Sequence, residues 1–166
     1  MKRDIRLMSS PMRIEKYPYP TLLNKCDQLD EWTVEHSLIA QGMIALAGIY
    51  GCRSLSANQV GFNYNFFVIY KDIPEVIINP EILEVEQDTY EYMREGCMSV
   101  SHILYYISRP GYIRVRYNDT RFNTIERSVS GLESKIFLHE VDHLNGKLII
   151  NYFTQEEKNE FERRFK

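Results

Sequence analysis

Two of the four histidines in this chain lie in one short motif, His139-Glu140-Val141-Asp142-His143. On an α-helix, positions i and i+4 share a face, so both imidazole groups could bind one metal ion. Glu140 would project close by, where its carboxylate could take a proton from a metal-activated water molecule. The motif therefore requires a fold in which one face of a helix meets a cavity. A solvated helix with two incidental histidines is the alternative.

A catalytic metal site usually has three protein ligands and leaves one position open to water. Cys97, within the sequence EGCMS at residues 95–99, could supply the third ligand as a thiolate, because a bound metal lowers the pKa of the thiol. Gly96 has no side chain, so a metal ion or an extended ligand could approach the backbone there. Taken alone, Cys97 could be a small buried hydrophobic residue. Together with the two histidines, it is interpreted as a ligand.

Two downstream alternatives for the third ligand are weaker. The metalloprotease pattern HExxHxxGxxH finds its glycine in Gly146, but Ile149 stands where the third histidine is needed. A downstream glutamate could serve instead, with Glu156, Glu157 and Glu160 as candidates. These glutamates lie in a charge-rich terminal segment, for which a solvated helix is the simpler interpretation.

A further polar element is the sequence SLSANQVG at residues 54–61, in which small residues precede an apolar stretch. The side-chain amide of Gln59 could donate a hydrogen bond to a developing oxyanion. Taken alone, a surface or turn-capping glutamine is the simpler interpretation.

Capping residues and hydrophobic periodicity predict three helices. The first begins at an N-cap, Asp30, and ends near residue 49, where Gly51 suits the exit. The second covers residues 132–144 and carries the HEVDH motif. A last helix, to residue 165, is predicted from Thr154 and Glu157, which resemble a capping box.

Extended segments fall mostly between these helices, without a regular alternation of strand and helix. They are predicted at residues 66–70, 76–78, 82–92, 112–117 and 124–129. The predicted fold class is α+β, with a mainly antiparallel sheet packed around a central helix that carries HExxH, an N-terminal helix and a short C-terminal helix. One domain is expected to cover residues 1–166.

Composition narrows the functional classes. The formal net charge of −3 gives no long-range attraction to nucleic acid or to an anionic membrane. Arg114 and Arg116 alternate with Val115 and Tyr117, as on the solvated face of a strand. No run of 18 apolar residues and no secretory signal in residues 1–11 are found, and three cysteines fit a reducing compartment. We therefore expect a cytoplasmic monomer.

The three polar elements, in this order, resemble those of peptide deformylases. The family pattern is a glycine-rich segment that ends in Gln, then EGCLS, then QHExDHLxG. Here SLSANQ lies at residues 54–59, EGCMS at 95–99 and LHEVDHLNG at 138–146. The resemblance also includes Arg109 and covers about residues 13–153, and EGC(L/M)S together with HExDHLxG is highly specific.

The resemblance implies removal of the formyl group from the N-terminal formylmethionine of new polypeptides at the ribosome, in a bacterial cytosol or in the host cytosol if a virus encodes the chain. Cys97, His139 and His143 would bind one divalent ion, with Fe²⁺ as the native metal and Zn²⁺, Ni²⁺ or Co²⁺ as replacements. Glu140 would act as general base. The amide of Gln59 and the backbone N–H of Met98 would stabilise the oxyanion.

The resemblance also implies a binding mode in which the backbone of the peptide pairs with the protein backbone near Gly96 and the Gln59 segment, with Gly96 and Ser54 as substrate-binding residues. An apolar pocket would accept the methionine side chain, with Leu132, Ile136 and Met93 as candidates. Leu132 and Ile136 lie four residues apart and therefore share a helical face.

The chain departs from the family pattern at several positions. Family members usually have Gly-x-Gly where this chain has Cys52-Arg53-Ser54, so Ser54 adds a Cβ where a close backbone approach is expected. Leu138 replaces the glutamine that usually precedes HExDH. Lys135 stands where the family places an apolar residue near the methionine pocket.

A supporting charge network could form from Asp142, Glu95 and Arg109, because a metal-bound histidine usually donates its other N–H to a polar partner. For Asp142, a plain charge on the helix surface is an equally good interpretation.

Two other functions stay open. The first is a metal-dependent peptidase, which shares the HExxH chemistry. The second is a non-catalytic metal-binding or ribosome-docking module. A structural metal site would need a fourth protein ligand. The spare thiols of Cys26 and Cys52 have no useful ligand spacing to Cys97.

Overall fold

A computed structural model describes residues 12–163 of the chain. Within them, seven strands form two antiparallel sheets. The larger sheet has the order β1-β2-β3-β6-β7, and its members are β1 (Ser54–Ser56), β2 (Phe66–Ile69), β3 (Glu75–Val85), β6 (Tyr112–Asn118) and β7 (Thr124–Ser130). The smaller sheet pairs β4 (Tyr90–Cys97) with β5 (Val100–Pro110). The predicted α+β class with antiparallel sheets is confirmed.

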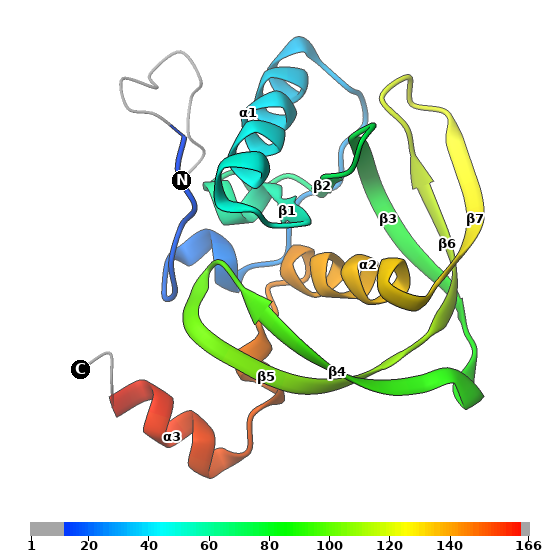
Figure 1. Ribbon diagram of the computed structural model, residues 1–166. Coiled ribbons are helices and arrows are strands. Elements are labelled where there is room, and N and C mark those ends of the chain that lie inside the picture. The colour runs from blue at the N-terminus through cyan, green and yellow to red at the C-terminus, as the bar shows by residue number, and fades with distance from the viewer. Residues whose placement is uncertain (1–11, 164–166) are drawn as a thin grey trace.

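The central helix α2 (Gly131–Leu144) packs against strands of both sheets. Figure 1 shows it inside the molecule, with the β4–β5 pair on one side and the larger sheet on the other. Its start is fixed by Gly131, whose N–H donates to the carbonyl of Gly111 and whose φ of 58° is a conformation that glycine adopts without strain. Buried Phe137 and Leu144 anchor one face in the core between α2 and the larger sheet. Val141 of the HEVDH motif packs against the same core, whereas His139 and His143 lie on the other side of the helix.

The first long helix, α1 (Val34–Tyr50), begins later than predicted. Its N-cap is Thr33 and not Asp30, because the Thr33 side chain accepts a hydrogen bond from the backbone N–H of His36 and so satisfies a free donor of the first turn. The predicted exit is confirmed: Gly51 caps α1 with a φ of 65°, in the left-handed region.

The last helix, α3 (Gln155–Arg163), confirms the predicted capping box. The Glu157 carboxylate accepts from the N–H of Thr154, and the Thr154 hydroxyl accepts from the N–H of Glu157. The predicted end of this helix at residue 165 lies outside the described residues. Within residues 12–163, none of the helices combines the length and apolar character that crossing a membrane requires.

The strand predictions are correct at β2, β6 and β7 and incomplete elsewhere. The predicted segment 82–92 is divided between β3 and β4 by a short 3-10 turn, Gln87–Thr89. The short strand β1 and the long strand β5 were not predicted. Arg114 and Arg116 do lie on the exposed face of β6, whose residues alternate between exposed and buried.

Candidate metal centre

Cys97, His139 and His143 meet at one point although they come from different elements. Cys97 ends β4 at an irregularity in its pairing with β5, and the two histidines project from successive turns of α2. Their ligand atoms all lie within 4.8 Å of one another, and the Cys97 Sγ lies 3.1 Å from the His143 Nε2. Bonds of about 2.3 Å to sulfur and about 2.05 Å to nitrogen around a tetrahedral ion would separate neighbouring ligand atoms by about 3.4–3.6 Å. The three side chains therefore fit one ion with a small adjustment.

The charges of these groups also suit a cation. Burial raises the pKa of the Cys97 thiol, but the charge of His143 and hydrogen bonds to both histidines outweigh it and hold this pKa well below its usual range. Burial lowers the pKa of His139, whereas its hydrogen bonds to Cys97 and Glu95 raise that pKa to about 10. The site thus favours a thiolate, which is the form of cysteine that binds metal, and a metal ion would displace the proton of His139.

A buried ion pair between Glu95 and Arg109 fixes the orientation of His139. Its Nδ1 lies 2.9 Å from the Glu95 Oε2, which directs the other ring nitrogen, Nε2, towards the site. Arg109 holds Glu95 in turn, with Nη2 donating to Oε2 at 3.0 Å, and also donates to Asp142 at 2.8 Å. The structure thus brings Asp142, Glu95 and Arg109 together in the predicted network. Partners of this kind fix the tautomer and angle of a metal-binding histidine.

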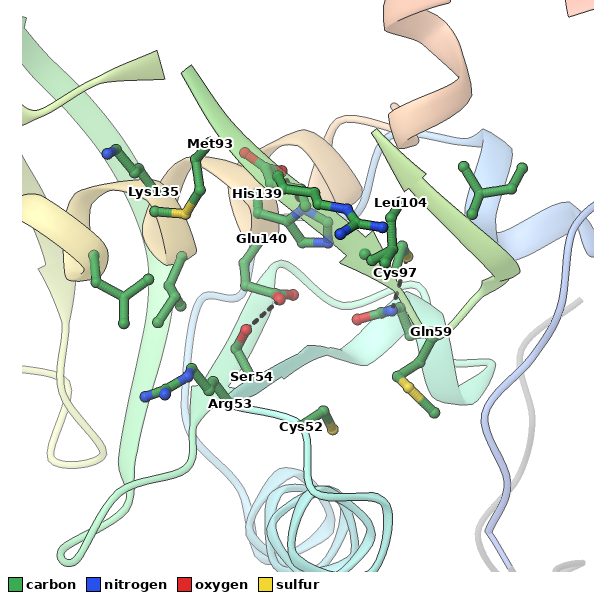
Figure 2. Close-up of a pocket in the computed structure, with 17 residues that line it drawn as sticks. Cys52, Arg53, Ser54, Gln59, Met93, Cys97, Leu104, Lys135, His139 and Glu140 are labelled. Carbon is green, nitrogen blue, oxygen red and sulfur yellow. Dashed lines mark hydrogen bonds and ion pairs between the residues drawn. The ribbon is translucent and has the colours of Figure 1, made fainter. Parts of the chain in front are cut away.

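Glu140 lies beside the ligand group and is 1% exposed. Its Oε1 accepts a hydrogen bond from the Ser54 hydroxyl at 2.6 Å, drawn as a dashed line in Figure 2. Its Oε2 is buried and has no hydrogen-bond partner among the described residues. A buried carboxylate oxygen without a partner is costly unless water or a ligand satisfies it, so this oxygen is available to chemistry in the site.

Gln59 is held so that its amide nitrogen faces Cys97. The Gln59 Oε1 accepts from the backbone N–H of Ser56 at 3.0 Å, which fixes which end of the amide points outward. Its Nε2 donates to the Ser99 hydroxyl at 3.1 Å and lies 3.7 Å from the Cys97 Sγ. The Gln59 amide nitrogen therefore lies beside Cys97 in the wall of the cavity.

A cavity of about 720 Å³ opens in front of the site. Its wall includes the four predicted substrate-binding residues, Ser54, Gly96, Leu132 and Ile136. Met93 and Met98 also line it. Of the residues that depart from the family pattern, Cys52, Arg53 and Lys135 also line it, whereas Leu138 packs against the core between α2 and the larger sheet. Figure 2 shows Lys135 beside Met93, away from Cys97.

Sequence reasoning missed Leu104, which also lines the cavity. A Cβ on Gly96 would lie 2.8 Å from the Leu104 Cδ2, so glycine leaves room for this side chain. It also missed the ion pair between Lys135 on α2 and Glu91 on β4, which joins two walls of the cavity. No sequence signal pointed to either contact, because both depend on how β4 and β5 pair and pack.

The alternative ligands lie elsewhere. Glu157 accepts hydrogen bonds from Thr154 and from Tyr105, and Glu160 lines a separate small hollow with Tyr105. Cys26 lies in the core between α2 and the larger sheet. Among the described residues, the ligand group consists of Cys97, His139 and His143, without a fourth protein ligand that would close the site.

Comparisons with known proteins agree over nearly the whole chain. The sequence model of the polypeptide deformylase family matches residues 11–159. The peptide deformylase of Thermotoga maritima is 36% identical over 142 residues, which are 84% of this chain and 85% of that protein. The peptide deformylase of Borreliella burgdorferi is 32% identical over 151 residues, which are 89% of this chain and 91% of that protein.

Solved structures give the same result. The crystal structure of peptide deformylase from Thermotoga maritima has a TM-score of 0.81 and 34% identity, covering 86% of this chain and 97% of that chain. The crystal structure of peptide deformylase from Ehrlichia chaffeensis in complex with actinonin has a TM-score of 0.86 and 25% identity, covering 94% and 96%.

Proposed function

The chain belongs to the polypeptide deformylase family. From that membership we propose that the protein removes the formyl group from the N-terminal formylmethionine of polypeptides. The observation that carries the proposal is the convergence of Cys97, His139 and His143 beside a buried carboxylate, Glu140, that has one oxygen free. A metal-dependent hydrolase needs this arrangement of ligands and base.

Cys97, His139 and His143 would hold one divalent ion. When bound, the ion would lower the pKa of water towards about 7 and polarise the formyl carbonyl. We propose Fe²⁺ as the native ion, with Zn²⁺, Ni²⁺ or Co²⁺ as replacements, because one thiolate and two imidazoles suit these metals better than Mg²⁺ or Ca²⁺.

Glu140 would act as the general base. Its free Oε2 would take a proton from the attacking water and later deliver it to the leaving amine, which contributes on the order of 10²–10⁴-fold to the rate. The amide of Gln59 and the backbone N–H of Met98 would donate to the oxyanion, each worth about 3 kcal/mol in comparable sites. Formate and a free amino terminus result.

The peptide would bind as an added strand. Among the strands of residues 12–163, β1 is one edge of the larger sheet and β4 pairs with β5 alone, so each has one side without a strand partner. Both strands reach the cavity, through Ser54 and Gly96. A peptide lying between them could form main-chain hydrogen bonds with either edge, while Leu132 and Ile136 contact its first side chain.

The test is an anaerobic assay of formyl-Met-Ala-Ser against the same peptide without the formyl group, with metal analysis of the same sample. We expect formate release from the first peptide and no cleavage of the second. Cleavage of internal amide bonds would support a peptidase instead. Glu140→Gln should retain metal and lose about 10²–10⁴-fold in kcat, whereas the control Glu156→Gln, at an exposed position of α3, should behave like the wild type.

We also propose that residues 1–166 act as one catalytic domain and as a monomer, which meets nascent chains at the ribosome in a bacterial or host cytosol. The match to relatives over most of their length supports the single domain. Sedimentation of the purified protein with and without ribosomes tests both the oligomeric state and the association.

A further inference from the structure

The hydrogen bond between Ser54 and Glu140 joins two elements that are far apart in sequence. Ser54 begins β1 and Glu140 lies on α2, and the hydroxyl donates to Oε1 at 2.6 Å. This bond is not required to stabilise β1, which is held by its pairing with β2. Its effect is on the carboxylate.

A glutamate side chain needs an external partner to fix its carboxylate, because the last torsion of glutamate is broad and roughly two-fold. In Glu140, Oε1 has Ser54 as its partner, whereas the buried Oε2 has none among the described residues. The hydroxyl of Ser54 therefore determines which oxygen is engaged and which is left facing the site.

The backbone of Ser54 is well placed to impose this orientation. Ser54 is in register with Ile69 of β2, and the carbonyl of the preceding Arg53 accepts from the N–H of Tyr70 at 2.7 Å. Upstream, Gly51 ends α1 in the left-handed conformation that leads the chain into β1. Since serine has a single side-chain torsion to the oxygen, little entropy is lost when the hydroxyl is fixed.

We propose that Ser54 is a positioning residue, whose hydroxyl holds the Glu140 carboxylate with Oε2 turned towards the metal position and the substrate. The inference rests on the proposed role of Glu140 as base. It differs from the sequence-based expectation, in which Ser54 only contacts the peptide. The two roles have opposite kinetic signatures: loss of positioning lowers kcat, whereas loss of a peptide contact that is equal in ground and transition states raises KM.

The experiment compares Ser54→Ala, Ser54→Gly and Ser54→Thr on formyl-Met-Ala-Ser, with metal content and melting temperature measured for each variant. Ser54→Ala and Ser54→Gly both remove the hydroxyl and should lower kcat about 10- to 100-fold with KM and metal content unchanged. Thr keeps a hydroxyl and should restore most of the rate. Ser128→Ala is the control, because it removes an exposed hydroxyl on β7 that accepts a hydrogen bond from Tyr112.

A second readout does not depend on activity. In a crystal structure of the metal-free Ser54→Ala protein, the Glu140 carboxylate should turn away from its wild-type orientation or occupy two orientations. A single, unchanged orientation would overturn the inference, as would wild-type kcat in Ser54→Ala, or a raised KM with unchanged kcat. So would a Thr variant that keeps the bond to Glu140 in its crystal structure and yet is as slow as Ala.

Failure of this inference can be told apart from failure of the proposed function. If Glu140→Gln deformylates at the full rate, the base is wrongly assigned and both proposals fail. If Glu140→Gln is inactive while Ser54→Ala keeps the wild-type rate, only the positioning role of Ser54 is wrong.

Discussion

Two clusters of arginine and carboxylate side chains, made of the same chemical groups, lie in opposite environments in this protein. The buried cluster consists of Arg109, Glu95 and Asp142, behind His139. In its central pair, the side chains of Arg109 and Glu95 are only 5% and 8% exposed. These charges are largely removed from water, so each is stabilised mainly by its charged partners.

The surface cluster consists of Arg114, Arg116, Glu81 and Glu126, on the exposed face of β3, β6 and β7. The side chains of Arg116 and Glu81 are 44% and 58% exposed. Each charge is solvated whether or not its partner is present, and salt screens the attraction. Both clusters have short contacts, so contact distance does not distinguish them. The contribution of an ion pair to the stability of this fold should therefore depend on its burial and on the groups that it orients.

The largest expected effect comes from breaking the buried cluster. Glu95→Gln removes one of the two carboxylates that pair with the buried guanidinium of Arg109 and leaves Asp142, and it should lower the free energy of unfolding by about 3–5 kcal/mol. It should also weaken metal binding about 10- to 100-fold, because His139 loses its charged partner. Chemical denaturation and metal titration measure the two effects. Glu126→Gln is the matched control, and an equal loss there would contradict the comparison.

Removal of the metal sharpens the same contrast. At one fixed free metal concentration, set to 100 times the Kd of the wild type, metal binding should stabilise the wild-type fold by about 2.7 kcal/mol, and a chelator should reverse this. The shift should shrink in Glu95→Gln and persist in Arg116→Ala, because only the first variant changes how His139 is held. Thermal melts with and without chelator provide the measurement. A shift that is equal in all three proteins would mean that the buried cluster does not support the metal centre.

The pair of Lys135 and Glu91 lies between the two extremes, because the lysine side chain is 6% exposed and the glutamate side chain 62%. Glu91→Gln would leave a buried ammonium group without a charged partner and should cost about 1–3 kcal/mol. Lys135→Met removes the buried charge and leaves a carboxylate that water can solvate, so stability should stay the same or rise. Denaturation midpoints of the two variants test this asymmetry, which would disappear if the pair acted as a surface pair.

The smallest effect is expected in the surface cluster. Arg116→Ala should leave the melting temperature almost unchanged at physiological salt, and any difference from the wild type should vanish in 1 M salt, where charges are screened within about 3 Å. Melting curves at two salt concentrations give the result. A salt-resistant loss of stability would show that this cluster is more than a solvated face.

The tertiary contacts explain where prediction from the sequence was incomplete. In β5 the usual pattern fails at three positions, because Leu104 and Tyr106 are 57% and 63% exposed whereas Arg109 is 4% exposed. A pattern search expects apolar residues inside and charges outside, so the burial along this strand departs from the expected alternation. The N-cap at Thr33 was missed for a simpler reason: Asp30 is an equally good capping residue in isolation, and only the path of the chain decides between them.

The sequence by itself predicted the ligand set and the base of the candidate site, because helical spacing within HEVDH is local and Cys97 lies in a recognisable motif of its own. It also determined the class of fold, since the hydrophobic period differs between helices and strands. Only the tertiary structure decided which partner each of these groups would have. Glu140 with Ser54, His139 with Glu95 and Lys135 with Glu91 are pairs 44 or 86 residues apart, and their contacts depend on how two sheets pack around α2. Such contacts follow from burial and close packing, which no local pattern encodes.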